Sequence, residues 1–155
     1  MVIGFKPYMI IKEMYFMQKT KIGIPTGLLA AAVFFVTLFS GYTGLILLAG
    51  YILLFEEDKW LKKMAVKAFF INAMFSLFSA LIGFIPDILS LINNIFGIFG
   101  KTFYIIPLSG IAVTITAIIS IVKKFLFIVL GLKALNRGTV AIGSVDKIAD
   151  KAIDD

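Results

Sequence analysis

The chain has 155 residues, of which 61% are hydrophobic and only 15% charged, and its net charge is +6. Soluble domains carry about 45–50% apolar and about 25% charged residues, so this composition indicates a membrane protein. The absence of cysteine and histidine excludes disulfides, thiolate and histidine metal sites, and histidine acid–base catalysis. Because the lysines stand beside apolar runs, we expect them to orient the chain in a membrane, with no nucleic-acid partner and no cofactor.

Three stretches without a charged side chain divide the sequence. They are 22–55 (34 residues), 68–86 (19 residues) and 102–122 (21 residues). About 20 helical residues cross a hydrocarbon core of roughly 30 Å. The pattern therefore predicts an all-α fold, a polytopic transmembrane helical bundle with three or four membrane segments and one interfacial amphipathic helix. The lipid bilayer is its first expected partner.

The N-terminal segment, residues 1–21, has scattered charges and no cleavage site typical of a signal peptide, and we expect it to lie at the membrane surface. Residues 22–55 would form a helix of about 51 Å, which is too long for one ordinary span. A break at Ser40–Gly44 offers two alternatives, a kinked and tilted helix or a short hairpin with halves of about 25 and 21 Å.

The connection that follows is rich in charge. The adjacent acids Glu56–Asp58 are expected to cap the next helix, where the helix dipole favours them. Three neighbouring acids alone indicate a solvated turn rather than a metal site. We expect Trp60 to anchor at the interface, with Lys62, Lys63 and Lys67 near the lipid headgroups.

A helix is predicted over residues 60–83. Small and polar residues follow one of its faces, a pattern that lets helices approach closely in lipid: Ala65, Ala68, Asn72, Ser76, Ser79 and Gly83. The opposite face carries phenylalanines suited to lipid. A second helix, over 86–100, is amphipathic, with Asp87, Ser90 and Asn94 on its polar face. We expect it to lie in the interface, or alternatively to line a polar cavity as a re-entrant element.

The last long helix is predicted over residues 108–136. Its stripe of small and polar residues includes Ser120 and Lys124 and is a natural partner for the first stripe. Lys123 and Lys124 either mark the end of a span or lie near mid-membrane, where a charge costs at least about 2.5–3.5 kcal/mol. In the second case Lys124 would meet Asn72, or both would line a polar path. The tail, 137–155, is predicted to be cytoplasmic, with a short solvated helix.

Lysine and arginine counts orient the chain. They are high in the N-terminal segment, in the 56–67 connection and in the tail, and low in 84–104. The positive-inside rule therefore predicts cytoplasmic N- and C-termini, with 84–104 outside. This arrangement requires residues 22–55 either to cross the membrane twice or to return to their own side.

Two blocks carry a family resemblance. Gly41–Phe70 has a Thr-Gly at Thr43-Gly44 and a short acidic turn, and a closing block spans Leu130–Ile153. Together they resemble small bacterial multi-pass membrane proteins related to the channel-like component of the chloroplast inner-envelope protein translocon. Met64 stands where that group has histidine, and Lys67 stands where it has glutamine. The resemblance implies a helical bundle in a bacterial plasma membrane, without an assigned activity.

These observations favour a non-enzymatic membrane protein with no catalytic, cofactor or metal residues. We expect it to act as an assembly or accessory subunit of a membrane complex through helix–helix packing, with itself or with other membrane proteins. The alternative is an oligomeric channel or transporter-like protein. Its polar path would be drawn from a few polar side chains: Asn72, Asp87, Asn93, Asn94, Lys123 and Lys124.

Overall fold

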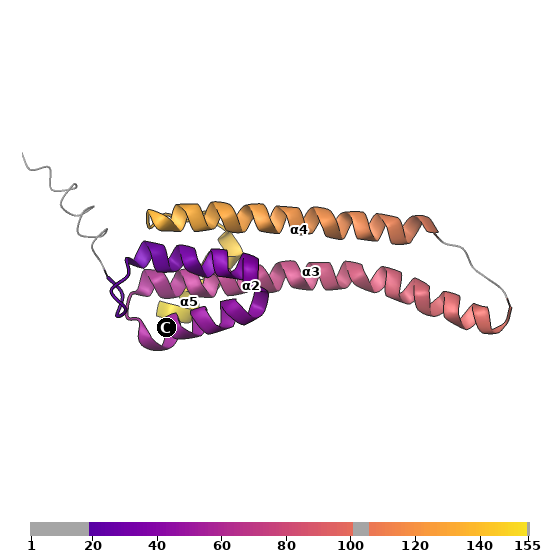
Figure 1. The fold of residues 1–155 in the computed structure, drawn as a ribbon, viewed down its shortest axis with the longest axis horizontal. Helices are drawn as coiled ribbons and strands as arrows, with labels where there is room; N and C mark the ends of the chain where they lie inside the picture. The colour runs from indigo at the N-terminus through magenta and orange to yellow at the C-terminus, as the bar shows by residue number, and fades with distance from the viewer. Residues whose placement is uncertain (1–18, 101–105, 155) are drawn as a thin grey trace, which may run out of the picture. The chain divides into compact units, whose positions relative to one another are not determined.

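The computed structural model describes residues 19–100 and 106–154, and within these ranges the chain is all-α. Four helices follow one another: α2 (Thr26–Phe55), α3 (Lys59–Ile98), α4 (Ile106–Leu135) and α5 (Gly143–Asp154) (Figure 1). The first three are long and apolar enough to cross a membrane. The predicted fold class, an all-α membrane bundle, is confirmed at this level. The prediction for the N-terminal segment falls mainly on residues 1–18, outside the described residues.

Helix α2 is a hairpin. Its backbone leaves helical geometry at Gly41, with φ 59° and ψ −137°, a region that only glycine enters readily. The ribbon of α2 doubles back within its own length (Figure 1). The backbone N–H of Lys21, just before the helix, donates to both carboxylate oxygens of Glu56, just after it, at 3.2 Å. A straight 30-residue helix would hold these ends about 45 Å apart, so the structure has the hairpin alternative.

Close packing holds the two halves of this hairpin together near the turn. A Cβ atom built on Gly44 would overlap the side chains of Val36 and Ser40, so only glycine fits there. Each half contains about 15 residues and measures about 21–22 Å, which is shorter than a hydrocarbon core of roughly 30 Å. The hairpin therefore suits a segment that enters a bilayer and returns to the same side.

Helix α3 corrects one prediction. The sequence predicts separate helices over 60–83 and 86–100, but the structure has one helix of 40 residues with Pro86 inside it. A proline inside a helix removes one backbone hydrogen bond and crowds the carbonyl four residues earlier, but apolar helices in membranes tolerate this. At about 60 Å, α3 is about twice the thickness of a hydrocarbon core.

The chain divides into two compact units. The first, called here the packed unit, contains the described residues 19–71 and 126–154. Its core is formed by almost fully buried apolar side chains from three helices: Val33, Phe34, Leu45, Ile52, Leu61, Ile71, Phe127 and Leu130. The rings of Phe34 and Phe127 meet edge to face at 5.9 Å. The start of α2 lies against the end of α4, because a Cβ on Gly27 would come within 2.5 Å of the Leu135 carbonyl oxygen.

The second unit, called here the apolar unit, contains the described residues 72–100 and 106–125. Among the side chains that the structure describes there, only Asn72 and Ala112 are buried. Large apolar side chains are exposed along both helices, including Leu77, Leu81 and Ile118. A surface of this kind requires lipid or another protein. The three apolar helices and this exposed surface fit a multi-pass membrane protein.

Candidate functional site at the charged end of the packed unit

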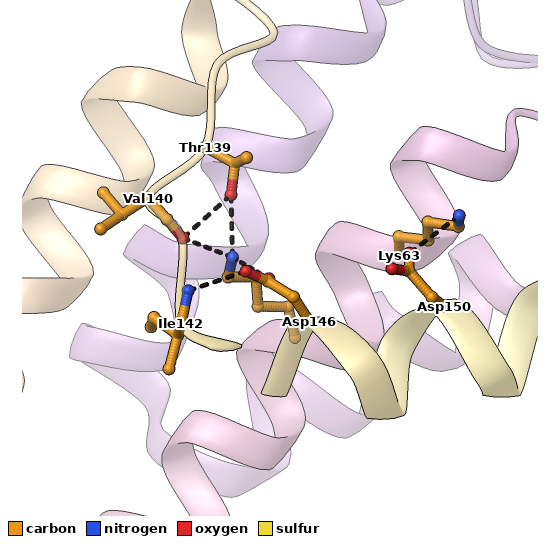
Figure 2. A network of polar contacts seen from close by, with 7 residues as sticks. Lys63, Thr139, Val140, Ile142, Asp146 and Asp150 are labelled. Carbon is orange, nitrogen blue, oxygen red and sulfur yellow. Dashed lines mark hydrogen bonds and ion pairs between the residues drawn. The ribbon is translucent and has the colours of Figure 1, made fainter. Parts of the chain in front are cut away.

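Lys67 is the buried centre of a polar cluster. It lies on α3 with 1% of its surface exposed. Its ammonium group donates to the Thr139 hydroxyl at 2.9 Å, to the Val140 carbonyl at 2.5 Å and to the Asp146 carboxylate (Figure 2). An ammonium has three donors, so these partners satisfy the whole group. The prediction that Lys67 lies at the lipid headgroups is wrong, because the tail folds over it.

Asp146 connects this cluster to the start of α5. Its second carboxylate oxygen accepts the Ile142 backbone N–H at 2.7 Å (Figure 2). Burial alone would raise the pKa of Asp146, but the hydrogen bonds from Lys67 and from the Ile142 N–H outweigh that effect and hold the pKa below its ordinary value. The carboxylate is therefore ionised at neutral pH, and it also lies in the first turn of α5, where the helix dipole favours a negative charge.

Two further lysines of α3 extend this contact along α5. Lys63 lies 2.9 Å from Asp150 and 2.6 Å from Asp154, and Lys59 lies 3.7 Å from Asp154. Figure 2 shows Lys63 facing Asp150 across the two helices. These contacts, led by the hydrogen bond from Lys63, also hold the pKa of Asp154 below its ordinary value.

Together these contacts form a Lys–Asp ladder. Its members recur every four residues on both helices, in antiparallel order: Lys59, Lys63 and Lys67 on α3, and Asp146, Asp150 and Asp154 on α5. The four-residue spacing places each set on one helix face. Val145 and Ala149 of α5 are buried beside the ladder. The tail is helical, as predicted, but one face of it is docked rather than solvated.

A second polar cluster surrounds Arg137, directly after α4. The guanidinium donates to the Asp58 carboxylate at 3.0 Å and to the Thr26 hydroxyl at 3.2 Å, and lies 4.9 Å from the ring centroid of Trp60. The other oxygen of Asp58 accepts the Leu61 N–H at 3.1 Å and so caps α3, as the sequence predicts for this acidic turn. Arg137 therefore joins the starts of α2 and α3 to the end of α4.

The backbone of Arg137 is unusual for its residue type. Its φ of 53° lies in the left-handed region that favours glycine. The Arg137 N–H donates to the Ala134 carbonyl and the Gly138 N–H to the Lys133 carbonyl, both at 2.9 Å. This is the Schellman arrangement that ends many helices, usually with glycine in the position of Arg137. An arginine there is explained by the contacts of its side chain.

Glu56 completes the charged end. It is 4% exposed, although it follows a helix that has no charged residue. Besides the Lys21 N–H, it accepts the Tyr51 hydroxyl at 3.1 Å, while the neighbouring Glu57 pairs with the Lys21 ammonium at 3.1 Å. Within residues 19–100 and 106–154, no group of three or more acids is placed to hold a metal ion.

The other predicted site residues lie on α3 and α4. Asn72 is 1% exposed. Those that are half-buried are Lys62, Ser76, Ser79, Ser120 and Lys123, and those that are exposed are Asp87, Asn94 and Lys124. The structure thus brings together Trp60, Lys63 and Lys67 with the tail, rather than forming a site around Lys124. The missed partners, Asp146 and Asp150, have the same four-residue spacing as the lysines, and this shared period is the signal that could have revealed them.

Comparisons with known proteins identify no relative. The chain matches no family model, no curated protein and no solved structure. The resemblance to the translocon-related bacterial group therefore stays an expectation from the two sequence blocks.

Proposed function

We propose that this protein is a non-enzymatic subunit that assembles in a membrane, with copies of itself or with other membrane proteins. The observation that carries the proposal is the small and polar stripe of α3 in the apolar unit. Ser76, Ser79 and Gly83 are only half-buried there. In lipid, small and polar residues of this kind are favoured where another helix packs closely against them.

Oligomeric state in a mild detergent tests this proposal. We expect native mass spectrometry of the wild type to give an oligomer or a fixed complex. Ser79→Leu should shift it to the monomer, because a bulky side chain separates the helices. The matched control is Leu81→Phe, which adds bulk on the opposite face at a residue that is 54% exposed. A wild type that is monomeric both in detergent and in nanodiscs, with no membrane protein in fixed ratio, contradicts the proposal.

The proposed membrane is a bacterial plasma membrane, with both ends of the chain on the cytoplasmic side. The contacts Lys21–Glu56 and Asp58–Arg137 support a common side for the start and end of α2, the start of α3 and the end of α4. The positive-inside rule then favours the cytoplasm, because most lysines lie in these segments. Because the chain has no native cysteine, labelling of Glu57→Cys from the outside of intact cells would refute this orientation.

A pore or transporter-like function is the second candidate. It is supported by Lys123 and Lys124, which stand well inside the apolar span Gly110–Leu135, and by the buried amide of Asn72. Ionisable residues inside a span usually serve a function. Ion flux into liposomes that is lost in the Lys123→Leu/Lys124→Leu variant would favour the pore. Absence of flux in the wild type would remove this candidate and leave the assembly proposal in place.

A further inference from the structure

An apolar groove lies between three helices of the packed unit. It is formed by the second half of α2, the first turns of α3 and the end of α5, and its volume is about 350 Å³. Its lining is apolar: Ala49, Gly50, Leu53, Val66, Phe69 and Ala152. Exposure of such a groove to water would be energetically unfavourable, so its occupant must be apolar.

Gly50 keeps the groove open. A Cβ atom built at this position meets no atom within 4 Å, so the space beside it is vacant and is not required by the packing of the helix. An unfilled apolar space loses the dispersion contacts of its lining atoms. For a chain in a bilayer, the apolar molecule always available to fill this space is the acyl chain of a lipid.

Lys62 gives the groove a charged end. It precedes Val66 by four residues and Phe69 by seven on α3, so the three share one helix face. The neighbouring Lys59, Lys63 and Lys67 are all paired with carboxylates of α5. Within the described ranges Lys62 has no ion-pair partner, and it is half-buried. Lysine can lay its alkyl stem along apolar surface while its ammonium stays in the polar interface.

We propose that this groove binds an acyl chain of an anionic phospholipid, and that Lys62 binds the phosphate of its headgroup. The nearest acids on α5 do not oppose this, since Asp150 and Asp154 are neutralised by Lys63, with Lys59 also beside Asp154. Lys62 therefore keeps a positive charge that no carboxylate neutralises within the described residues, and this charge favours an anionic over a zwitterionic headgroup. This lipid site is independent of the proposed assembly through the stripe of α3.

Binding of defined lipids tests the proposal. The purified full-length chain in detergent is titrated with phosphatidylglycerol or phosphatidylcholine, and bound lipid is counted by native mass spectrometry. We expect one phosphatidylglycerol to bind in preference to phosphatidylcholine. Gly50→Leu should weaken binding of both lipids at least about tenfold, because its side chain fills the groove. Lys62→Gln should weaken only phosphatidylglycerol, by about fivefold, the worth of one lysine near an anionic surface.

Matched substitutions elsewhere make the test specific. Gly97→Leu places the same side chain at another open glycine of α3, and Lys147→Gln removes an exposed lysine of α5. Both should bind lipid as the wild type does. Glycerol phosphate, which lacks acyl chains, should not compete. Equal binding of the two lipids by the wild type, or unchanged binding in Gly50→Leu, overturns the proposal.

Discussion

The packed unit and the apolar unit both consist of apolar helical segments. Only the packed unit has a core of several buried apolar side chains. Every ion pair in the described part of the chain lies in the packed unit. The apolar unit buries only Asn72 and Ala112 among its described side chains. Since lipid tails are as apolar as leucine, helices in a bilayer gain little by contact unless small residues or polar groups make the contact specific.

The two units therefore differ in what specifies them. In the packed unit, glycines permit close approach and buried charges have defined partners, so one arrangement of helices is favoured. In the apolar unit the side chains are compatible with lipid on most faces, and Ser76, Ser79 and Gly83 of the α3 stripe are only half-buried. The following predictions test this difference, from the largest expected effect to the smallest.

Asp146→Ala should have the largest effect. It removes a carboxylate from Lys67, which is 1% exposed, and a buried charge left without its ion partner costs about 3–5 kcal/mol. We expect α5 to detach, and hydrogen exchange of residues 139–154 to rise to the level of an exposed segment.

Asp150→Ala is the control for that variant. It lies on the same helix and in the same ladder, but the side chain of Asp150 is 60% exposed. An exposed pair contributes about 0–1 kcal/mol, so protection of α5 should persist. Equal hydrogen exchange in the two variants would show that the Lys67–Asp146 pair, although buried, holds α5 no more strongly than the Lys63–Asp150 pair.

A matched pair of leucines on α3 compares the two units directly. Leu61 is fully buried, whereas Leu81 is 54% exposed. Leu61→Ala should destabilise the protein by about 2–5 kcal/mol, and Leu81→Ala by about 0.5 kcal/mol or less. Thermal unfolding in the same detergent measures both. A large loss in Leu81→Ala would mean that another protein surface covers this face.

Substitutions of Arg137 separate its side chain from its backbone. Arg137→Ala loses the contacts with Asp58 and Trp60 and keeps the unfavourable φ, whereas Arg137→Gly loses the same contacts but relieves the backbone by about 1 kcal/mol. We expect both to be less stable than the wild type, and glycine to be the better of the two. Emission from Trp60, the only tryptophan, should shift in both. Equal stability of the two variants would exclude a backbone cost at residue 137.

A change of pH between 8 and 5 should have the smallest effect on the protection of α5. The folded-state pKa values of Asp146 and Asp154 lie below their ordinary value of 3.8. Such groups contribute stability that is fully present above that value and is lost as the pH falls through the folded pKa. Protection of α5 should therefore be constant from pH 8 to 5 and decrease only below about pH 4. Release of α5 near pH 6 would be incompatible with these carboxylates as its anchors.

Much of the fold follows from the sequence. Uncharged runs are long enough to identify apolar helices, and Gly41 and Gly44 mark the turn of α2, because helix periodicity and glycine chemistry are local properties. Pro86 shows the limit of local signals. A proline permits a break in a helix, but α3 continues through Pro86, with apolar residues on both sides of it.

The ladder shows a different limit. The lysines of α3 and their partner acids of α5 are 79 to 95 positions apart in the sequence, and each set alone fits a solvated or headgroup-facing surface. Their shared period was visible, but pairing depends on where the end of α4 and Arg137 direct the tail. That geometry is a tertiary property. In the sequence Arg137 is only one more positive charge of the tail, but in the structure its side chain joins three helices.

The matched period of the ladder has a mechanical consequence. Moving α5 by four residues along α3, about 6 Å, would place Lys67 opposite Asp150 and Lys63 opposite Asp154. Lys63 already contacts both Asp150 and Asp154, the partners before and after such a step. The contacts of Lys67 distinguish the two positions, since Thr139 and Val140 bind the same ammonium as Asp146. The outer Lys–Asp pairs would be equivalent before and after such a shift, so the contacts of Lys67 set the register of α5 along α3.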